Sequence, residues 1–242
     1  MKRVEGASDV PRETVRIEEL GARYRLSGAQ ISQLRVLLEV LEESLDAPSS
    51  VTLPTEAVDV HIADSLSALE LEELRQPDVI ADLGSGAGFP ALVLAIARPD
   101  SRVFAVESTA RKCRFIETAV GRLQLSNLEV VWSRAESWSE GAGGCDVVCA
   151  RALASLPVLC EYAAPLLRLG GVLVAWKGEL DPDEAARAAR AAARLALSPP
   201  VAVSARPYPG SLNRRLYRVE KRGETPPGFP RRPGMAVKRS LG

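Results

Sequence analysis

Histidine and aromatic residues are scarce in this 242-residue chain, which has one histidine and an aromatic content of 5%. With His61 alone, a His-rich metal site is excluded and a Ser-His-Asp hydrolase is disfavoured. The four cysteines include no C-x-x-C pair, so we expect reduced thiols in a cytoplasmic protein that binds no metal. No apolar run of about 18 residues occurs, so we expect no membrane partner.

The net charge of zero hides a local excess of basic residues. Residues 213–242 contain nine Lys or Arg against two acids, and Arg187, Arg190 and Arg194 recur at helical spacing. The pair Arg231-Arg232 adds to this charge. Such a surface either contacts a polyanion or is a solvated face, and the pattern leaves both open.

Two helical patterns occupy the first part of the chain, after a polar segment 1–16 that we expect to be loosely ordered. The first pattern follows Ser27, a good N-cap, and runs from Ile31 to Leu45. The segment Asp46–Ser50 breaks it.

A second helical pattern begins near Thr55 and extends to Leu69. It places His61 and Asp64, three positions apart, as neighbours. These two could reach a site on the following domain, but the pattern alone favours a local pair on the helix surface.

From residue 78, short β-branched runs alternate with helical ones. Alternation of this kind requires crossover connections, and it predicts an α/β fold with a mostly parallel seven-stranded sheet covered on both faces. An antiparallel pair is expected at the sheet edge. The predicted strands are 78–84, 102–107, 128–134, 146–152, 171–177, 201–207 and 215–221, and the predicted helices are 90–98, 109–123, 156–167 and 182–197. We therefore expect a helical extension (1–76), an α/β core (77–223) and a basic tail (224–242).

The strongest motif follows the first of these strands and reads Asp82-Leu83-Gly84-Ser85-Gly86-Ala87-Gly88-Phe89-Pro90. Glycines let a backbone approach a ligand closely, and the following helix presents free N–H groups. Such a turn lies at the carboxyl ends of the strands, where ligands bind in open α/β sheets. A tight turn without a ligand is the alternative.

The glycine spacing favours S-adenosylmethionine over a dinucleotide. A dinucleotide loop would carry its third glycine at position 89, where the chain has Phe89. S-adenosylmethionine has no pyrophosphate but carries an ammonium and a sulfonium, which suits Asp82 beside Gly84, Gly86 and Gly88. An NAD-dependent oxidoreductase therefore ranks last.

Three further strand ends carry polar candidates at the same edge. Glu107 lies where an acid can accept both ribose hydroxyls, and Ala135-Glu136 where a backbone N–H and an acid could read adenine. Arg151 ends the fourth strand and is expected to orient cofactor or substrate, although a structural salt bridge explains it equally well. Lys177 ends the fifth strand on the same rim.

Taken in order, these residues resemble the RsmG (GidB) family, the bacterial 16S rRNA guanine-N7 methyltransferases. The chain departs from the family pattern at Leu41-Glu42-Glu43, where a Trp-Asn pair is usual. The matching segments are 61–66, 82–90, 97–100, 106–108, 134–136, 150–153, 165–171, 177–179 and 230–234.

The resemblance implies a class I (Rossmann-like) S-adenosylmethionine methyltransferase fold, with Gly84, Phe89, Ala135, Glu136 and Arg151 binding the cofactor. It implies methyl transfer to N7 of a guanine in the decoding-site stem-loop of 16S rRNA. The expected partner is that rRNA or the small ribosomal subunit, with no DNA bound and a monomeric chain. Two alternatives stay open: a methyltransferase of this fold acting on a small metabolite, and a cofactor-sensing RNA-binding module without turnover.

Overall fold

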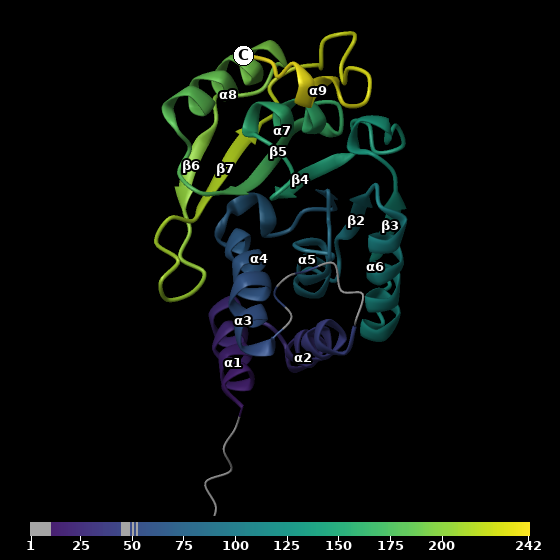
Figure 1. Cartoon of the computed structure of the whole chain (residues 1–242), viewed down its shortest axis with the longest axis vertical. Helices are drawn as coiled ribbons and strands as arrows, with labels where there is room; N and C mark the ends of the chain where they lie inside the picture. The colour runs from purple at the N-terminus through teal and green to yellow at the C-terminus, as the bar shows by residue number, and fades with distance from the viewer. Residues whose placement is uncertain (1–10, 45–48, 50, 52) are drawn as a thin grey trace, which may run out of the picture.

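A seven-stranded sheet forms the centre of the computed structural model, which describes residues 11–44, 49, 51 and 53–242 (Figure 1). The strand order is β3-β2-β1-β4-β5-β7-β6, with β1 to β5 parallel and β7 antiparallel to both neighbours. The predicted sheet and its antiparallel edge pair are confirmed. The strands are β1 Val79–Leu83, β2 Arg102–Glu107, β3 Leu128–Trp132, β4 Cys145–Arg151, β5 Leu167–Lys177, β6 Val201–Ser204 and β7 Arg215–Glu220.

Strand β5 begins four residues earlier than the sequence predicts, at Leu167. It pairs Leu167 with Cys145 and then shifts register, so that Val172 faces Val147. Gly171 lies at this shift, where an added Cβ would stand 2.8 Å from the Cys145 carbonyl oxygen. The close backbone approach explains why the strand continues through a glycine that the pattern assigns to its start.

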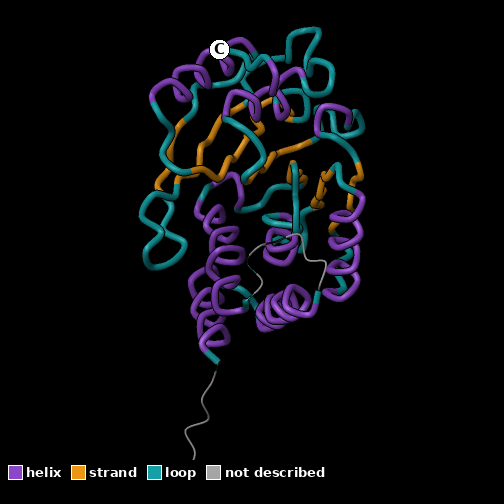
Figure 2. Tube along the Cα trace, viewed as in Figure 1, coloured by secondary structure: helices purple, strands orange, loops and turns teal. Residues whose placement is uncertain are grey.

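One face of the sheet is covered by the N-terminal helices together with α5 and α6 (Figure 2). The segment 12–24, part of which the sequence predicts to be loosely ordered, is a helix instead. It buries Ile17, Leu20 and Gly21. In α2 the predicted N-cap is confirmed, because Ser27 accepts from the Gln30 N–H in a capping box. The helices are α1 Arg12–Tyr24, α2 Gly28–Glu43, α5 Ala91–Ala97 and α6 Ala110–Leu123. Leu45 and most of the predicted break at 46–50 lie outside the described residues.

The second helical pattern is not one regular helix. It divides into α3 (Pro54–Ala57), a π-helical turn η1 (Val58–Ala63), α4 (Asp64–Leu66) and a 3₁₀ turn η2 (Ser67–Glu70). A π turn shifts the positions of the side chains that follow it, and such turns are frequent at functional sites. His61 lies within this one.

The other face is covered by α7 (Leu156–Ala163), α8 (Pro182–Arg194) and the C-terminal residues that include α9 (Met235–Lys238), at the top of Figure 1. Asp181 caps α8 by accepting from the Glu184 N–H at 2.8 Å. The four cysteines are free and buried. Within the described residues, no helix has the length and apolar character needed to cross a membrane.

Candidate cofactor and substrate site

The loop after β1 adopts a backbone that depends on glycine. Gly84, Gly86 and Gly88 have φ of +68°, +62° and +85°, values that side chains with a Cβ rarely allow. The Gly84 N–H donates to the Val106 carbonyl at 2.8 Å, which ties the loop to β2. An added Cβ at Gly86 would meet only the Gly84 carbonyl oxygen, at 3.8 Å. The loop therefore exposes backbone at the carboxyl edge of the sheet.

Asp82 is buried beneath this loop at the end of β1. Its Oδ2 accepts from the Ala91 N–H at 3.1 Å, whereas Oδ1 has no hydrogen-bond partner among the described residues. Burial raises the pKa of Asp82 to about 7, despite hydrogen bonds that favour its ionised form. A buried carboxylate oxygen without a partner fits a cationic ligand, so the ammonium-bearing cofactor suits this site.

Glu107, at the end of β2, lies next to the same loop. Its Oε2 accepts from the Gly86 N–H at 3.1 Å and its Oε1 from the Thr109 N–H at 2.8 Å. The Ser108 hydroxyl also donates to Oε1, at 3.5 Å. A carboxylate offers about four lone-pair sites, so one acceptor position, on Oε2, remains for a ribose hydroxyl. Glu107 thus holds the loop in shape and keeps one of the two acceptor positions that the sequence predicts.

A pocket beside the loop is lined by Gly84, Ser108, Ala135, Glu136 and Tyr162, among others. Glu136 lies in the short 3₁₀ turn η4 (Ala135–Ser137), after β3. Burial alone would raise the pKa of Glu136, but hydrogen bonds from backbone N–H groups, chiefly that of Gly234, outweigh it and lower the pKa. The sequence-predicted adenine residues therefore share one pocket with the glycine loop, and Glu136 carries a charge there.

Arg151 joins the N-terminal helices to this edge of the sheet. Its Nη1 donates to the Val60 carbonyl at 2.9 Å and to Asp64 Oδ2 at 3.1 Å. Its Nη2 lies 3.2 Å from His61 Nδ1. The structural salt bridge expected as one alternative for Arg151 is thus present, and it lies inside the site.

His61 and Asp64 are buried, with exposed fractions of 8% and 1%, so the expectation of a surface pair was wrong. The His61 ring stacks on Phe89 of the glycine loop, with centroids 4.5 Å apart. Its Nε2 is 3.0 Å from the Val51 carbonyl, which assigns the proton to Nε2 and leaves Nδ1 as the acceptor for Arg151. Burial and the Arg151 charge lower the pKa of His61 to about 4. The helical spacing of His61 and Asp64 could not predict this burial, because the burial depends on contacts with Phe89 and Arg151, which are distant in the sequence.

Lys177 lies on the same rim but is engaged elsewhere. Its Nζ is 3.0 Å from Glu184 Oε1 and donates to the Ala154 carbonyl at 3.2 Å. Lys177 therefore holds the 152–155 loop against α8. Trp176, in contrast, is buried and donates through Nε1 to the Asp64 carbonyl at 2.8 Å, as a core residue.

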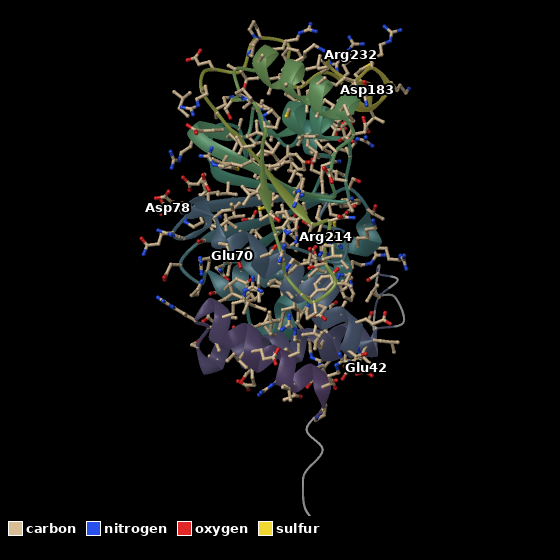
Figure 3. All side chains as sticks on the ribbon, turned by 90° about the vertical axis from the view of Figure 1, so that its left-hand side faces the viewer. Glu42, Glu70, Asp78, Asp183, Arg214 and Arg232 are labelled. Carbon is tan, nitrogen blue, oxygen red and sulfur yellow. The ribbon has the colours of Figure 1, made fainter. Side chains whose placement is uncertain are left out.

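Arg214, in the loop before β7, is a site residue that no sequence motif marks. Its Nε is 3.4 Å from Asp64 Oδ1, whereas Arg151 binds the other carboxylate oxygen of Asp64, Oδ2. Figure 3 shows Arg214 midway along the molecule, with the basic residue Arg232 far above it. No local motif distinguishes Arg214 from Arg215, so only the fold identifies it.

The basic stripe of α8 is largely exposed. Arg187 is half-buried, and the Arg194 guanidinium lies 5.9 Å from the centre of the Phe229 ring. Arg231 binds Glu161. Arg194 and Arg231 thus contact the C-terminal residues or the helix that carries them, while Arg190 and Arg194 are the exposed members of the stripe.

A family model described as rRNA small subunit methyltransferase G (GidB) matches residues 30–205 of this chain. The chain belongs to this family. The matched range includes the π turn with His61, the glycine loop and Arg151, and it confirms the resemblance inferred from the sequence.

Relatives in the GidB family match most of the chain. A protein of Rubrobacter xylanophilus is 43% identical over 75% of this chain and 72% of its own length. A protein of Deinococcus radiodurans is 38% identical over 93% of this chain and 89% of its own length. Both carry the name ribosomal RNA small subunit methyltransferase G.

Solved structures with lower identity confirm the class I methyltransferase fold. An S-adenosylmethionine-dependent methyltransferase from Aquifex aeolicus has a TM-score of 0.53 and 17% identity, covering 68% of this chain and 93% of the other. The antibiotic-resistance methyltransferase Kmr has a TM-score of 0.51 and 19% identity, covering 62% and 89%.

Proposed function

We propose that this GidB-family chain transfers a methyl group from S-adenosylmethionine to N7 of a guanine in the decoding-site stem-loop of 16S rRNA. The observation that carries the proposal is the match of the family model over residues 30–205. This range includes both the buried cluster of His61, Asp64 and Arg151 and the glycine loop. The matching relatives bear the name of an rRNA methyltransferase.

The chain's own residues divide the work of holding the cofactor. Asp82, Gly84, Gly86 and Gly88 would hold the amino-acid end, where the orphaned Asp82 oxygen would accept an ammonium group. Glu107 would accept from ribose, and Ala135 and Glu136 would recognise adenine. Phe89 and Arg151, which contact each other, would hold the part of the cofactor next to the substrate. When bound, S-adenosylmethionine supplies an electrophilic methyl group on its sulfonium.

The transfer needs no general base, because guanine N7 has a free lone pair at neutral pH. His61 agrees with this chemistry, since a pKa of about 4 keeps the ring neutral. Its role is to accept from Arg151, and Asp64 holds the same guanidinium by an ion pair. Arg151 is thus oriented before the substrate arrives, and the rate enhancement comes mainly from such positioning. Lys177 contributes by fixing the 152–155 loop.

The test is methyl transfer to small-subunit rRNA from a strain that lacks the gene. Purified chain and radiolabelled S-adenosylmethionine are incubated with naked 16S rRNA and, separately, with intact small subunits. Primer extension after cleavage at 7-methylguanine should show one stop, in the decoding-site stem-loop. Absence of label in both substrates, or label in a low-molecular-weight acceptor, would refute the proposal. We further propose that the active chain is a cytoplasmic monomer.

A further inference from the structure

The C-terminal residues fold back onto α7 and α8. Ala236 and Leu241 are buried, with exposed fractions of 1% and 4%, in the core formed with these helices. Figure 1 shows this segment packed around α9 at the end of the molecule formed by α7 and α8. The segment therefore belongs to the folded unit that carries the cofactor pocket.

Arg231 anchors the segment on α7. Its Nε and Nη2 donate to the two oxygens of Glu161 at 2.8 and 2.6 Å, and its backbone N–H donates to Oε1 at 3.1 Å. The Glu161 side chain is 1% exposed. A bidentate pair with a buried carboxylate fixes the direction and the register of the chain that follows. The Arg231 guanidinium therefore binds a carboxylate within the protein, and we do not expect it to bind an RNA phosphate.

Three residues beyond this anchor, the segment reaches the cofactor pocket. The Gly234 N–H donates to Glu136 Oε1 at 2.9 Å, and the hydroxyl of Tyr162, the neighbour of Glu161 on α7, also bonds Glu136. Gly234 has φ of +80°, a conformation that favours glycine. The Glu136 side chain is only 4% exposed. Its carboxylate is thus oriented by donors that stand outside the glycine loop.

We propose that segment 231–234 is a positioning element for cofactor recognition. Arg231 holds the segment on Glu161, and the Gly234 N–H then fixes the Glu136 carboxylate. The acceptor position left beside the contacts of Glu136 with Arg134, Tyr162 and its own N–H would accept the 6-amino group of adenine. This inference rests on the proposed function, because it assumes that Glu136 faces adenine. Coupling of this kind is reciprocal, so a bound cofactor also holds the segment in place.

The test measures binding of S-adenosylhomocysteine to the full chain by calorimetry. The variant combines Arg231→Met with Glu161→Gln, which removes the ion pair without leaving a buried charge unpaired. We expect its affinity to fall about tenfold, the size of one charge-assisted hydrogen bond. Arg232→Ala is the matched control, since Arg232 is the exposed neighbour of Arg231, and it should bind like the wild type.

A second ligand separates positioning from general damage to the fold. In this analogue the adenine 6-amino group is replaced by hydrogen, so Glu136 has nothing to accept from. The double variant and the wild type should bind the analogue equally. An unchanged affinity for S-adenosylhomocysteine, or an equal loss for both ligands, would overturn the proposal.

Hydrogen exchange in the wild type gives an independent answer if the double variant does not fold. Saturating S-adenosylhomocysteine should slow exchange of the Gly234 amide several-fold more than that of Ala191 in α8. Equal slowing of both amides would contradict the coupling. Failure of the cofactor assignment within the proposed function would look different, because the wild-type chain would then show no binding of S-adenosylhomocysteine at all.

Discussion

Binding of the cofactor should release a proton from Asp82. In the cofactor-free chain, burial raises the pKa of this carboxyl from 3.8 to about 7, which corresponds to about 4 kcal/mol against the charged form. A cation placed against the unpartnered Oδ1 would favour the carboxylate and lower its pKa by about 1–3 units. At neutral pH and below, the acid must therefore ionise as the cofactor binds.

The number of protons released follows from the pKa of Asp82 before and after the cofactor binds. If binding lowers the pKa of Asp82 by about two units, roughly 0.7 proton is released per cofactor at about pH 6.5 and almost none at about pH 8.5. The direction of the pH dependence follows from this release: because Asp82 must lose its proton when the cofactor binds, the affinity for the cofactor rises with pH. Affinity should consequently increase about fiftyfold between about pH 5 and pH 8.

Calorimetry in two buffers of different ionisation enthalpy measures the released proton directly. Asp82→Asn should abolish the release attributed to this residue and weaken binding about tenfold at about pH 8, because the amide carries no charge. Asp78→Asn is the control, since Asp78 lies just before the opposite end of β1 and is exposed (Figure 3). The same proton release in wild type and Asp82→Asn would refute the assignment of Asp82 to the cofactor's ammonium group.

Three other substitutions test the remaining parts of the site. In urea titrations, the difference in the free energy of unfolding between wild type and His61→Gln should fall by up to about 3 kcal/mol between about pH 6.5 and pH 4, because unfolded His61 takes up a proton before the folded residue with its pKa of about 4. Asp82, whose pKa burial raises to about 7, changes the stability in the opposite direction, but equally in both proteins, so the difference reports on His61 alone. Arg151→Lys should lower methyl transfer to rRNA about a hundredfold, because an ammonium cannot bind Val60, Asp64 and His61 in one plane; an unchanged rate would contradict this role. Glu107→Ala should weaken S-adenosylhomocysteine binding about a hundredfold in calorimetry, since it loses ribose contacts and frees the Gly86 N–H, and unaltered binding would show that Glu107 does not bind ribose.

The sheet and the cofactor loop could be predicted because both depend on neighbouring residues. Alternation of β-branched and helical runs determined five parallel strands, and the end of β2 at Glu107 was placed correctly. Gly84, Gly86 and Gly88, which need positive φ, alternate with other residues within one short segment, so the conformation of the loop can be predicted from that segment alone. The division into extension, core and tail at residues 76 and 223 stays a prediction.

The first helix was missed although it carries a signal. Its buried residues Ile17, Leu20 and Gly21 follow helical spacing, but charged residues surround them and dilute the pattern. The close contact of Gly21 with Ile31, where an added Cβ would lie 2.5 Å from Cδ1, shows that packing on α2 holds this helix. Local propensity does not contain that contact.

The substrate side of the site could not be predicted because long-range contacts create it. Arg151 and Asp64 are 87 positions apart, and Gly234 and Glu136 are 98 apart. From the sequence alone, Asp64 could belong to a pair on the surface of a helix and Glu136 could be a solvated acid in a loop. The fold shows instead that both side chains are buried and contact residues far away in the sequence.

The local contacts of the glycine loop and the long-range contacts of Arg151 imply that cofactor binding and substrate positioning depend on different parts of the chain. Under the proposed function, residues of the glycine loop and of the first strand ends would hold the cofactor through local geometry, whereas Arg151 depends on Val60, His61 and Asp64 from the N-terminal helices. These helices would then belong to the unit that positions the substrate. Because the cluster contacts the loop through the stacked rings of His61 and Phe89, a disturbance of the N-terminal helices should act first on turnover and only secondarily on cofactor affinity.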